Sequence, residues 1–303
     1  MFDVAIVGAG VAGITAAITA KTRNCEVAVF GNDIITSDLY KAKNVDNYLG
    51  FYNISGKELC KNFLEHLNKF DININNKKVS QILSMGDYYA LNAGNQFYET
   101  KAIILATGTQ RQKIIKGEDE FLGKGLSYCA TCDGMLFKNK IVAVTGNSPE
   151  IQEEIEFLSK IAKKIYYIKN KINNIDIKVN NNNIEIINDS INEMLGETYL
   201  KGLKLNESVL ECDGLFILNN NMPINSLING IEKTQSGEIK TDKSMKTNLP
   251  GVFAAGDCTG KPYQVQKAAG EAQVAALSAV NYLFDLKNKL KGVDNIVNNN
   301  NKR

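Results

Sequence analysis

The chain has 303 residues, of which 44% are hydrophobic and 22% charged, which is the composition of a globular protein long enough for two domains of ordinary size. No stretch reaches the roughly 18 uninterrupted apolar residues of a membrane helix, and the start MFDVAIVGAG lacks the features of a secretion signal, so we expect a cytoplasmic protein. A net charge of +2 makes neither nucleic acid nor a membrane an expected partner.

The N-terminus is expected to form a βαβ unit. Phe2–Val7 is predicted to be a buried parallel strand, Val11–Lys21 a helix and Glu26–Phe30 a second strand.

The turn inside this unit carries Gly8, Gly10 and Gly13 in the spacing G-x-G-x-x-G. The first glycine makes the turn, the second lets a pyrophosphate approach the backbone, and the third packs helix on strand. A dinucleotide site is therefore expected. The usual position of a ribose-binding acid holds Gly31, with Asp33 two residues beyond, so the motif alone does not distinguish NAD from FAD.

The next segments are a helix and a group of strands. Gly56–Phe70 has helical apolar spacing and contains His66, which is expected to be a surface or interface residue. Short strands are predicted within Lys77–Glu99, followed by the apolar strand Ala102–Leu105 and a turn containing Thr107 and Gly108.

A second βαβ unit is predicted further along, with strand Lys140–Val144, helix Pro149–Ile161 and strand Ile165–Ile168. The stretch Ile184–Leu218 is rich in predicted strands. The fold class is therefore α/β, with two Rossmann-like, three-layer domains.

The C-terminal part is expected to return to the first domain through strand Leu249–Ala254 and the long helix Gln264–Leu286. The expected domains are 1–110 (dinucleotide-binding, first part), 111–243 (degenerate nucleotide-binding-like, with the cysteine pair) and 244–303 (dinucleotide-binding, second part, and tail). Gly256 and Asp257 follow the returning strand, and this carboxylate is suited to accept a hydrogen bond from a ribityl hydroxyl. With the two earlier glycine turns, this gives three pieces that would converge on one flavin.

Two of the six cysteines, Cys129 and Cys132, are close in sequence. A C-x-x-C pair is half of a zinc site or a redox pair. A second such pair is missing, His66 is the one histidine, and the other cysteines are too scattered for an iron–sulfur cluster, so a redox pair is expected and no metal. Asp133 is the candidate acid for proton transfer to the leaving thiolate.

The stretch Ser127–Gly134 (SYCATCDG) resembles the active-site signature of low-molecular-weight thioredoxin reductases. The same family pattern fits Val7–Gly13, Val45–Gly50, Ala106–Gly108 and Pro250–Asp257. The resemblance implies FAD as cofactor, thioredoxin as substrate, a homodimer, and two domains that swivel. It also implies that Cys132 faces the flavin, that Cys129 attacks the substrate disulfide, and that Asp133 is the acid/base group.

The second βαβ unit departs from this family, whose turn there reads G-x-G-x-x-A and binds NADPH. The aligned residues are Thr145–Glu150 (TGNSPE), in which side chains at Thr145 and Asn147 are expected to obstruct a pyrophosphate and Glu150 to repel it. The next strand is followed by Lys169-Asn170-Lys171 and, further on, Ile175, in place of the arginines that clamp the 2′-phosphate.

These losses resemble the ferredoxin-dependent flavin thioredoxin reductases, which lack nicotinamide-binding motifs. The leading hypothesis is therefore electron transfer from reduced ferredoxin through FAD and the cysteine pair to thioredoxin. The alternatives are an NAD(P)H-dependent thioredoxin reductase with a degenerate site, a non-enzymatic FAD-binding redox sensor, and a zinc-binding module.

Overall fold

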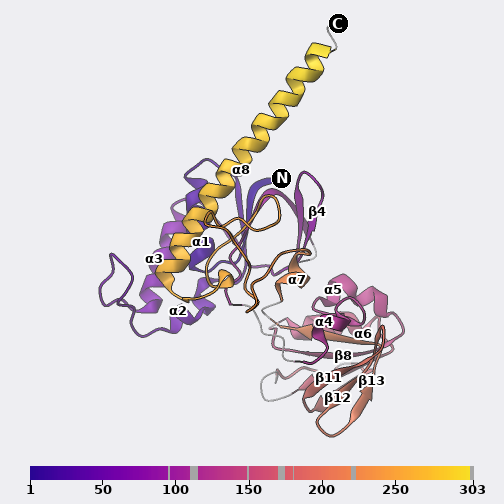
Figure 1. Cartoon of the computed structure of the whole chain (residues 1–303). Coiled ribbons are helices and arrows are strands. Elements are labelled where there is room, and N and C mark those ends of the chain that lie inside the picture. Colours follow the sequence, from indigo (N-terminus) through magenta and orange to yellow (C-terminus); the bar gives the residue numbers. More distant parts are fainter. Residues whose placement is uncertain are drawn as a thin grey trace. The chain divides into compact units, whose positions relative to one another are not determined.

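The structure is a computed structural model that describes residues 1–94, 96–109, 115–148, 150–169, 175–179, 181–219 and 223–300. It divides into two compact units (Figure 1). Unit 1 comprises Met1–Gln110 and Ile224–Arg303, and unit 2 comprises Arg111–Pro223. Both units are built on parallel strands with helices, so the predicted α/β fold class is confirmed.

Unit 1 contains the predicted βαβ unit, a strand meander and the returning C-terminal segment. Its elements are β1 (Phe2–Val7), α1 (Val11–Lys21), β2 (Val27–Phe30), η1 (Ile34–Thr36), α2 (Asp38–Lys41), α3 (Gly56–Asn68), β3 (Ile74–Asn75), β4 (Val79–Ser84), β5 (Tyr89–Ala93), β6 (Gln96–Leu105), α7 (Ile224–Leu227), β15 (Val252–Ala254), η3 (Asp257–Thr259) and α8 (Val265–Asn300).

The seven-stranded sheet of unit 1 has the order β3-β2-β1-β6-β5-β4, with β15 also paired to β6. Strands β2, β1, β6 and β15 are parallel, and their last residues lie abreast, because Val7 is in register with Phe30 and Leu105, and Leu105 with Ala254. The carboxyl ends of these strands therefore meet at one edge of the sheet, where ligands of α/β folds bind.

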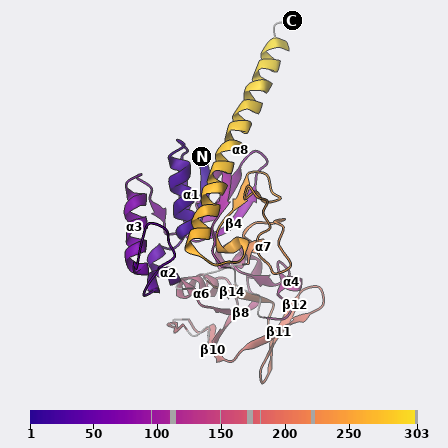
Figure 2. The same ribbon diagram turned by 60° about the vertical axis from the view of Figure 1, so that its left-hand side comes forward.

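Both faces of this sheet are buried, which explains the continuous apolar sequence of β1. Val4 and Ile6 pack in the cluster that includes alanines of α1 and α8, whereas Ala5 and Val7 pack on the opposite face with the 224–258 segment. Helices α1 and α8 lie side by side in both views, and α8 runs on past the sheet (Figures 1 and 2). Alanine at the α1–α8 contact permits this close approach.

The expected return to the first domain at residue 244 was placed too late, because the structure assigns Ile224 onward to unit 1. Ile224, Leu227 and Ile228 are buried against the β4–β6 meander. The physical reason is that these apolar side chains fill the second face of the sheet of unit 1.

Unit 2 repeats the same three-layer plan. Its elements are α4 (Glu118–Phe121), β7 (Leu126–Ser127), α5 (Ala130–Asp133), η2 (Gly134–Phe137), β8 (Ile141–Gly146), α6 (Ile151–Ser159), β9 (Lys164–Lys169), β10 (Ile184–Asn188), β11 (Ile191–Gly196), β12 (Leu200–Leu205), β13 (Val209–Glu211) and β14 (Gly214–Leu218). A parallel sheet, β10-β9-β8-β14-β7, packs α5 and α6 on one face and the antiparallel sheet β11-β12-β13 on the other.

The closing helix begins at Val265, next to its predicted start, and continues to Asn300 rather than ending at Leu286. Within the described residues, none of the helices combines the length and hydropathy required to cross a membrane.

Candidate functional site

Three predicted cofactor-binding pieces follow the parallel strands at the same edge of unit 1. Gly8–Gly13 follows β1, Thr107-Gly108 follows β6 and Gly256-Asp257 follows β15. Since those strands end abreast, the three pieces lie at the same edge of the sheet, where they were predicted to bind one flavin.

The glycines of the first turn have different roles. A Cβ on Gly8 (φ 116°) would lie 2.0 Å from Ala106 O, and a Cβ on Gly13 would lie 1.8 Å from Gly8 O, so both positions exclude a side chain by packing. A Cβ on Gly10 would meet nothing within 4 Å. Gly10 is also the N-cap of α1 and provides no side-chain cap, so bare backbone at the start of a helix borders this open space. This cradle fits a pyrophosphate.

The missing acid after β2 has a steric cause. Gly31 has φ 146°, and its Cβ would lie 3.0 Å from the amide nitrogen of Ala9 in the glycine turn. The side chain of Asp33 accepts a hydrogen bond from the backbone N–H of Ile35 at 3.2 Å and thereby caps η1.

The other two pieces have polar groups suited to a flavin. The buried Thr107 Oγ1 lies beside the thiol of Cys258, and the backbone of Thr107 follows β6 at the edge where the glycine turns lie. Gly108 has φ 71° and open space at its Cβ position. Burial raises the pKa of Asp257, an effect that Lys267 opposes and Glu271 strengthens. These residues together would hold FAD.

Two residues of α8, Lys267 and Glu271, form hydrogen bonds with the backbone of Gly256. The sequence predictions missed both of them. Lys267 Nζ donates to Gly256 O at 2.8 Å, and Glu271 Oε2 accepts from Gly256 N at 2.9 Å. The two side chains form an ion pair at 3.1 Å. The sequence signal that could have indicated them is the i, i+4 spacing of opposite charges, although such pairs ordinarily lie on the exposed face of a helix.

Gln264, which lies in the Tyr263-Gln264-Val265 stretch where the family has Tyr-Arg-Gln, contacts another family motif. Its Oε1 accepts a hydrogen bond from Asn47 Nδ2 at 2.8 Å, which ties the Val45–Gly50 loop to the start of α8.

In unit 2, Cys129 and Cys132 form a disulfide with a Cα–Cα distance of 5.4 Å. Cys129 is buried and is the N-cap of α5, and its Sγ accepts the N–H of Cys132 at 3.1 Å. An N–H donated to sulfur stabilises a thiolate there once the disulfide opens. Cys132 is partly exposed.

Asp133 lies directly beside this pair. Ser127 Oγ donates to Asp133 Oδ2 at 2.7 Å and accepts the N–H of Cys129 at 3.1 Å. The carboxylate is therefore connected through one hydroxyl to the backbone of Cys129.

The remaining cysteines are buried and outside any disulfide. Burial raises the pKa of Cys258 to about 11, so this thiol stays protonated despite its place next to Asp257. His66 is exposed on α3 and contacts the ring of Phe70. Within the described ranges, no three His, Cys, Asp or Glu side chains are grouped in a way that could hold a metal ion.

The second glycine turn has a different alignment from the one expected. A Cβ on Gly146 (φ 155°) would lie 1.8 Å from Leu218 O, which is the packing role that Gly8 has in unit 1. Gly146 is thus the first glycine of the motif, and Thr145 belongs to β8, where its hydroxyl donates to Ile168 O at 3.0 Å. The buried Ser148 and Ile151 occupy the places of Gly10 and Gly13.

This turn uses its own amide groups internally. Four backbone N–H groups donate to protein oxygens. The hydrogen bonds are Asn147 N to Asn219 Oδ1 (2.9 Å), Ser148 N to Leu218 O (3.0 Å), Glu150 N to Ser148 Oγ (3.2 Å) and Ile151 N to Ser148 O (3.1 Å). Pro149, which lies outside the described residues, has no N–H. The N–H donors of this turn are therefore engaged within the protein, and the hydroxyl of Thr145, expected to obstruct a pyrophosphate, is instead bonded to Ile168 O.

At the end of β9, the sequence lacks the arginines that would recognise a 2′-phosphate. The lysine at this position, Lys169, forms an ion pair. Lys169 Nζ contacts Asp176 Oδ1 at 2.5 Å. Asn170 and Lys171 lie outside the described residues.

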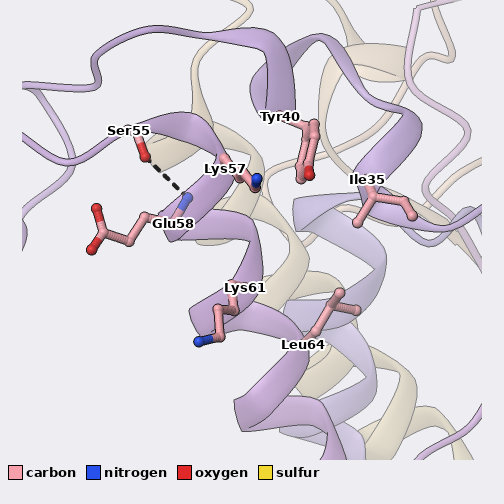
Figure 3. A pocket seen from close by; sticks show the side chains of 7 residues that line it. All are labelled: Ile35, Tyr40, Ser55, Lys57, Glu58, Lys61 and Leu64. Carbon is pink, nitrogen blue, oxygen red and sulfur yellow. Dashed lines mark hydrogen bonds between the residues drawn. The ribbon is translucent and has the colours of Figure 1, made fainter.

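A cavity of about 440 Å³ lies beside α3, lined in part by Tyr40, Lys57, Lys61 and Leu64 (Figure 3). Ser55 Oγ accepts the N–H of Glu58 at 3.2 Å, so the helix start is already capped. None of the residues of the three glycine turns lines this cavity.

Comparison with known proteins agrees with these features. Residues 2–272 match the family model "Pyridine nucleotide-disulphide oxidoreductase". Thioredoxin reductase of Listeria monocytogenes is 31% identical, covering 96% of this chain and 97% of the relative, and that of Treponema pallidum is 34% identical, covering 95% and 99%. The crystal structure of a ferredoxin-flavin thioredoxin reductase from Clostridium acetobutylicum is 43% identical with a TM-score of 0.85, covering 94% of this chain and 98% of that one.

An atypical thioredoxin reductase from Desulfovibrio vulgaris Hildenborough is 26% identical with a TM-score of 0.73, covering 94% and 99%. The resemblance inferred from the motifs is thereby confirmed. The chain belongs to the pyridine nucleotide-disulphide oxidoreductase family, as a homologue of thioredoxin reductases, and this membership implies FAD as its cofactor.

Proposed function

We propose that the chain is a thioredoxin-disulfide reductase that receives its electrons from reduced ferredoxin. Two ferredoxins each give one electron, the Cys129–Cys132 disulfide becomes two thiols with uptake of two protons, and these thiols reduce one thioredoxin disulfide. Gly8, Gly10, Gly13, Thr107, Gly108, Gly256 and Asp257 are the proposed FAD contacts.

The observation that carries the choice of donor is the contrast between the two glycine turns. The turn before α1 leaves bare backbone beside open space at Gly10, whereas the turn before α6 has its amide groups bonded to Asn219, Leu218 and Ser148. A pyrophosphate needs such amides as donors. NADPH would have to break these bonds, so a donor that does not bind there is favoured.

FAD, when bound, supplies the chemistry that links single-electron input to two-electron disulfide reduction. The proposed role of Cys129 is attack on the thioredoxin disulfide as a thiolate, which forms a mixed disulfide and releases one thioredoxin thiolate. The N–H of Cys132 on Cys129 Sγ favours that thiolate. Cys132 then attacks Cys129 in the mixed disulfide, which releases the second thioredoxin thiolate and restores the Cys129–Cys132 bond.

Asp133 is proposed to move the protons of this cycle. It is held by Ser127 beside the pair and can protonate a leaving thiolate in one direction and remove a proton from a thiol in the other. Because Cys129 is buried, its segment has to become accessible before thioredoxin can be attacked.

The donor is tested anaerobically with purified holoenzyme by following flavin absorbance. Reduced ferredoxin should bleach the flavin rapidly, and excess NADPH or NADH should bleach it hardly at all. Cys132→Ser is the matched control, because it should still be bleached by ferredoxin yet fail to reduce thioredoxin. Rapid bleaching by NADPH would instead support the alternative, a nicotinamide-dependent reductase with a degenerate site.

The expected homodimer and cytoplasmic location belong to the same proposal. Light scattering during size-exclusion chromatography measures the mass directly, and a value near the 33.4 kDa of one chain would contradict the dimer.

A further inference from the structure

The turn from Gly256 to Gly260 has an irregular backbone. Gly256 has φ 87° and ψ −152°, and Gly260 has φ 111°. A Cβ on Gly256 would lie 2.9 Å from the Cβ of Ala12 in the first turn of α1, so this turn abuts the dinucleotide cradle. Polar groups of such a segment need partners from elsewhere in the fold.

Helix α8 supplies these partners with two charged side chains. Lys267 Nζ donates to Gly256 O at 2.8 Å, to Gly260 O at 2.7 Å and to Thr259 Oγ1 at 2.9 Å, which accounts for all three of its N–H groups. Glu271 Oε2 accepts from Gly256 N at 2.9 Å and from Thr259 Oγ1 at 2.8 Å. The pair is largely buried, with side-chain exposures of 16% and 22%.

The geometry points to the Lys267–Glu271 pair as a clip that holds the Gly256–Gly260 turn in the shape that presents Asp257 to FAD. Both polar groups of Gly256 are engaged, one by each member of the pair. Loss of Lys267 removes the donor of Gly260 O, one of the donors of Gly256 O and the counter-charge of the partly buried Glu271 carboxylate, in the turn that contains Asp257. Both are therefore positioning residues for the cofactor. This inference rests on FAD binding at this edge, as in the proposed function, and not on ferredoxin.

The two charges also act on Asp257 with opposite sign. Lys267 lowers the pKa of Asp257 and Glu271 raises it. No titratable residue occurs in Gly8–Gly13, and Glu238 faces Gly260 from the preceding segment. An ionised Asp257 would accept the hydrogen bond of a ribityl hydroxyl, and protonation weakens that acceptor, so FAD affinity falls as pH falls through this pKa.

The test is equilibrium dialysis of holoenzyme between pH 4 and pH 8, with free and bound FAD measured at each pH. Lys267→Met should weaken FAD binding at neutral pH by about tenfold, the loss expected for a charged hydrogen bond. It should also move the acid loss of FAD to higher pH. Glu271→Gln keeps the shape of the side chain and should move that loss to lower pH. Lys287→Met, an exposed charge on the same helix, is the matched control.

If the pH at which FAD is lost moves in opposite directions in the two variants, the clip is supported. General destabilisation of the protein would move this pH in the same direction in both. Wild-type affinity in both variants, or shifts of the same sign, would overturn the clip. If Lys267→Met does not fold, Glu271→Gln alone tests the clip: loss of FAD at lower pH than in the wild type supports it, and loss at higher pH overturns it. The donor assay is independent of this result, because FAD affinity is measured without any reductant.

Discussion

The roles of Gly10 and Gly13 can be separated by the same substitution, alanine, at each position. Gly10 has φ −78° and ψ −168°, which alanine adopts, and open space at its Cβ position. Alanine there restricts the unfolded chain, a gain of about 0.4–1 kcal/mol, and is a poorer N-cap, a loss of about 0.5–1 kcal/mol. The free energy of unfolding without FAD should therefore hardly change, and the Tm should stay within about 2 °C of wild type.

The same methyl group occupies the space in which a pyrophosphate would approach the backbone. Overpacking of this kind costs about 1–3 kcal/mol, which corresponds to a loss of FAD affinity of about 5- to 150-fold. Gly13→Ala should behave in the opposite way, because its Cβ would lie 1.8 Å from Gly8 O and the helix has to move away from β1. That variant should lose several degrees of Tm even without FAD.

Thermal unfolding of the FAD-free protein and FAD titration of the same samples measure both quantities. Wild-type FAD affinity in Gly10→Ala would refute the assignment of the pyrophosphate to this turn. A fall in Tm of Gly10→Ala as large as that of Gly13→Ala would refute the distinction between an open position and a packed one.

Three further substitutions test other parts of the molecule. Asp133→Asn should slow thioredoxin reduction by about 100- to 10,000-fold, the usual contribution of a general acid, with unchanged FAD content; wild-type turnover would remove Asp133 from the mechanism. Gly146→Ala should lower the Tm of unit 2 in calorimetry, because its Cβ would lie 1.8 Å from Leu218 O, and an unchanged Tm would contradict the packing role. Burial raises the pKa of Tyr167 to about 12 from its ordinary 10, so its contribution to stability, complete below pH 10, should be lost as pH rises from 10 to 12, and Tyr167→Phe should abolish that loss in alkaline unfolding curves.

The local motifs were predictable from sequence because each is a short pattern with a single mechanical meaning. The strand, glycine turn and helix from Phe2 to Lys21 have the predicted bounds. The cysteine pair was predictable for the same reason, since a spacing of three residues brings two sulfurs within bonding reach.

Features that depend on tertiary contact were not predictable. Lys267 and Glu271 have the spacing of an exposed helix pair, and their role depends on a turn that only the folded chain brings to them. The return to unit 1 at Ile224 was missed because its isoleucines and leucines are isolated in a segment without helical or strand periodicity. The alignment of the second turn was displaced because a single glycine, Gly146, is not enough in the sequence to show that it is the first glycine of the motif and the last residue of β8.

The insertion of unit 2 within unit 1 determines the order in which the chain can fold during synthesis. Unit 2 is continuous, so all of its strands have been synthesised before β15 and α8. Unit 1, although it starts first, lacks until then the strand that borders β6, the helix that covers α1, and the turn that carries Asp257. Unit 2, which contains the Cys129–Cys132 disulfide, is therefore expected to fold first. Unit 1 is completed last, and the proposed FAD contacts at Gly256 and Asp257 cannot form until most of the chain has been synthesised.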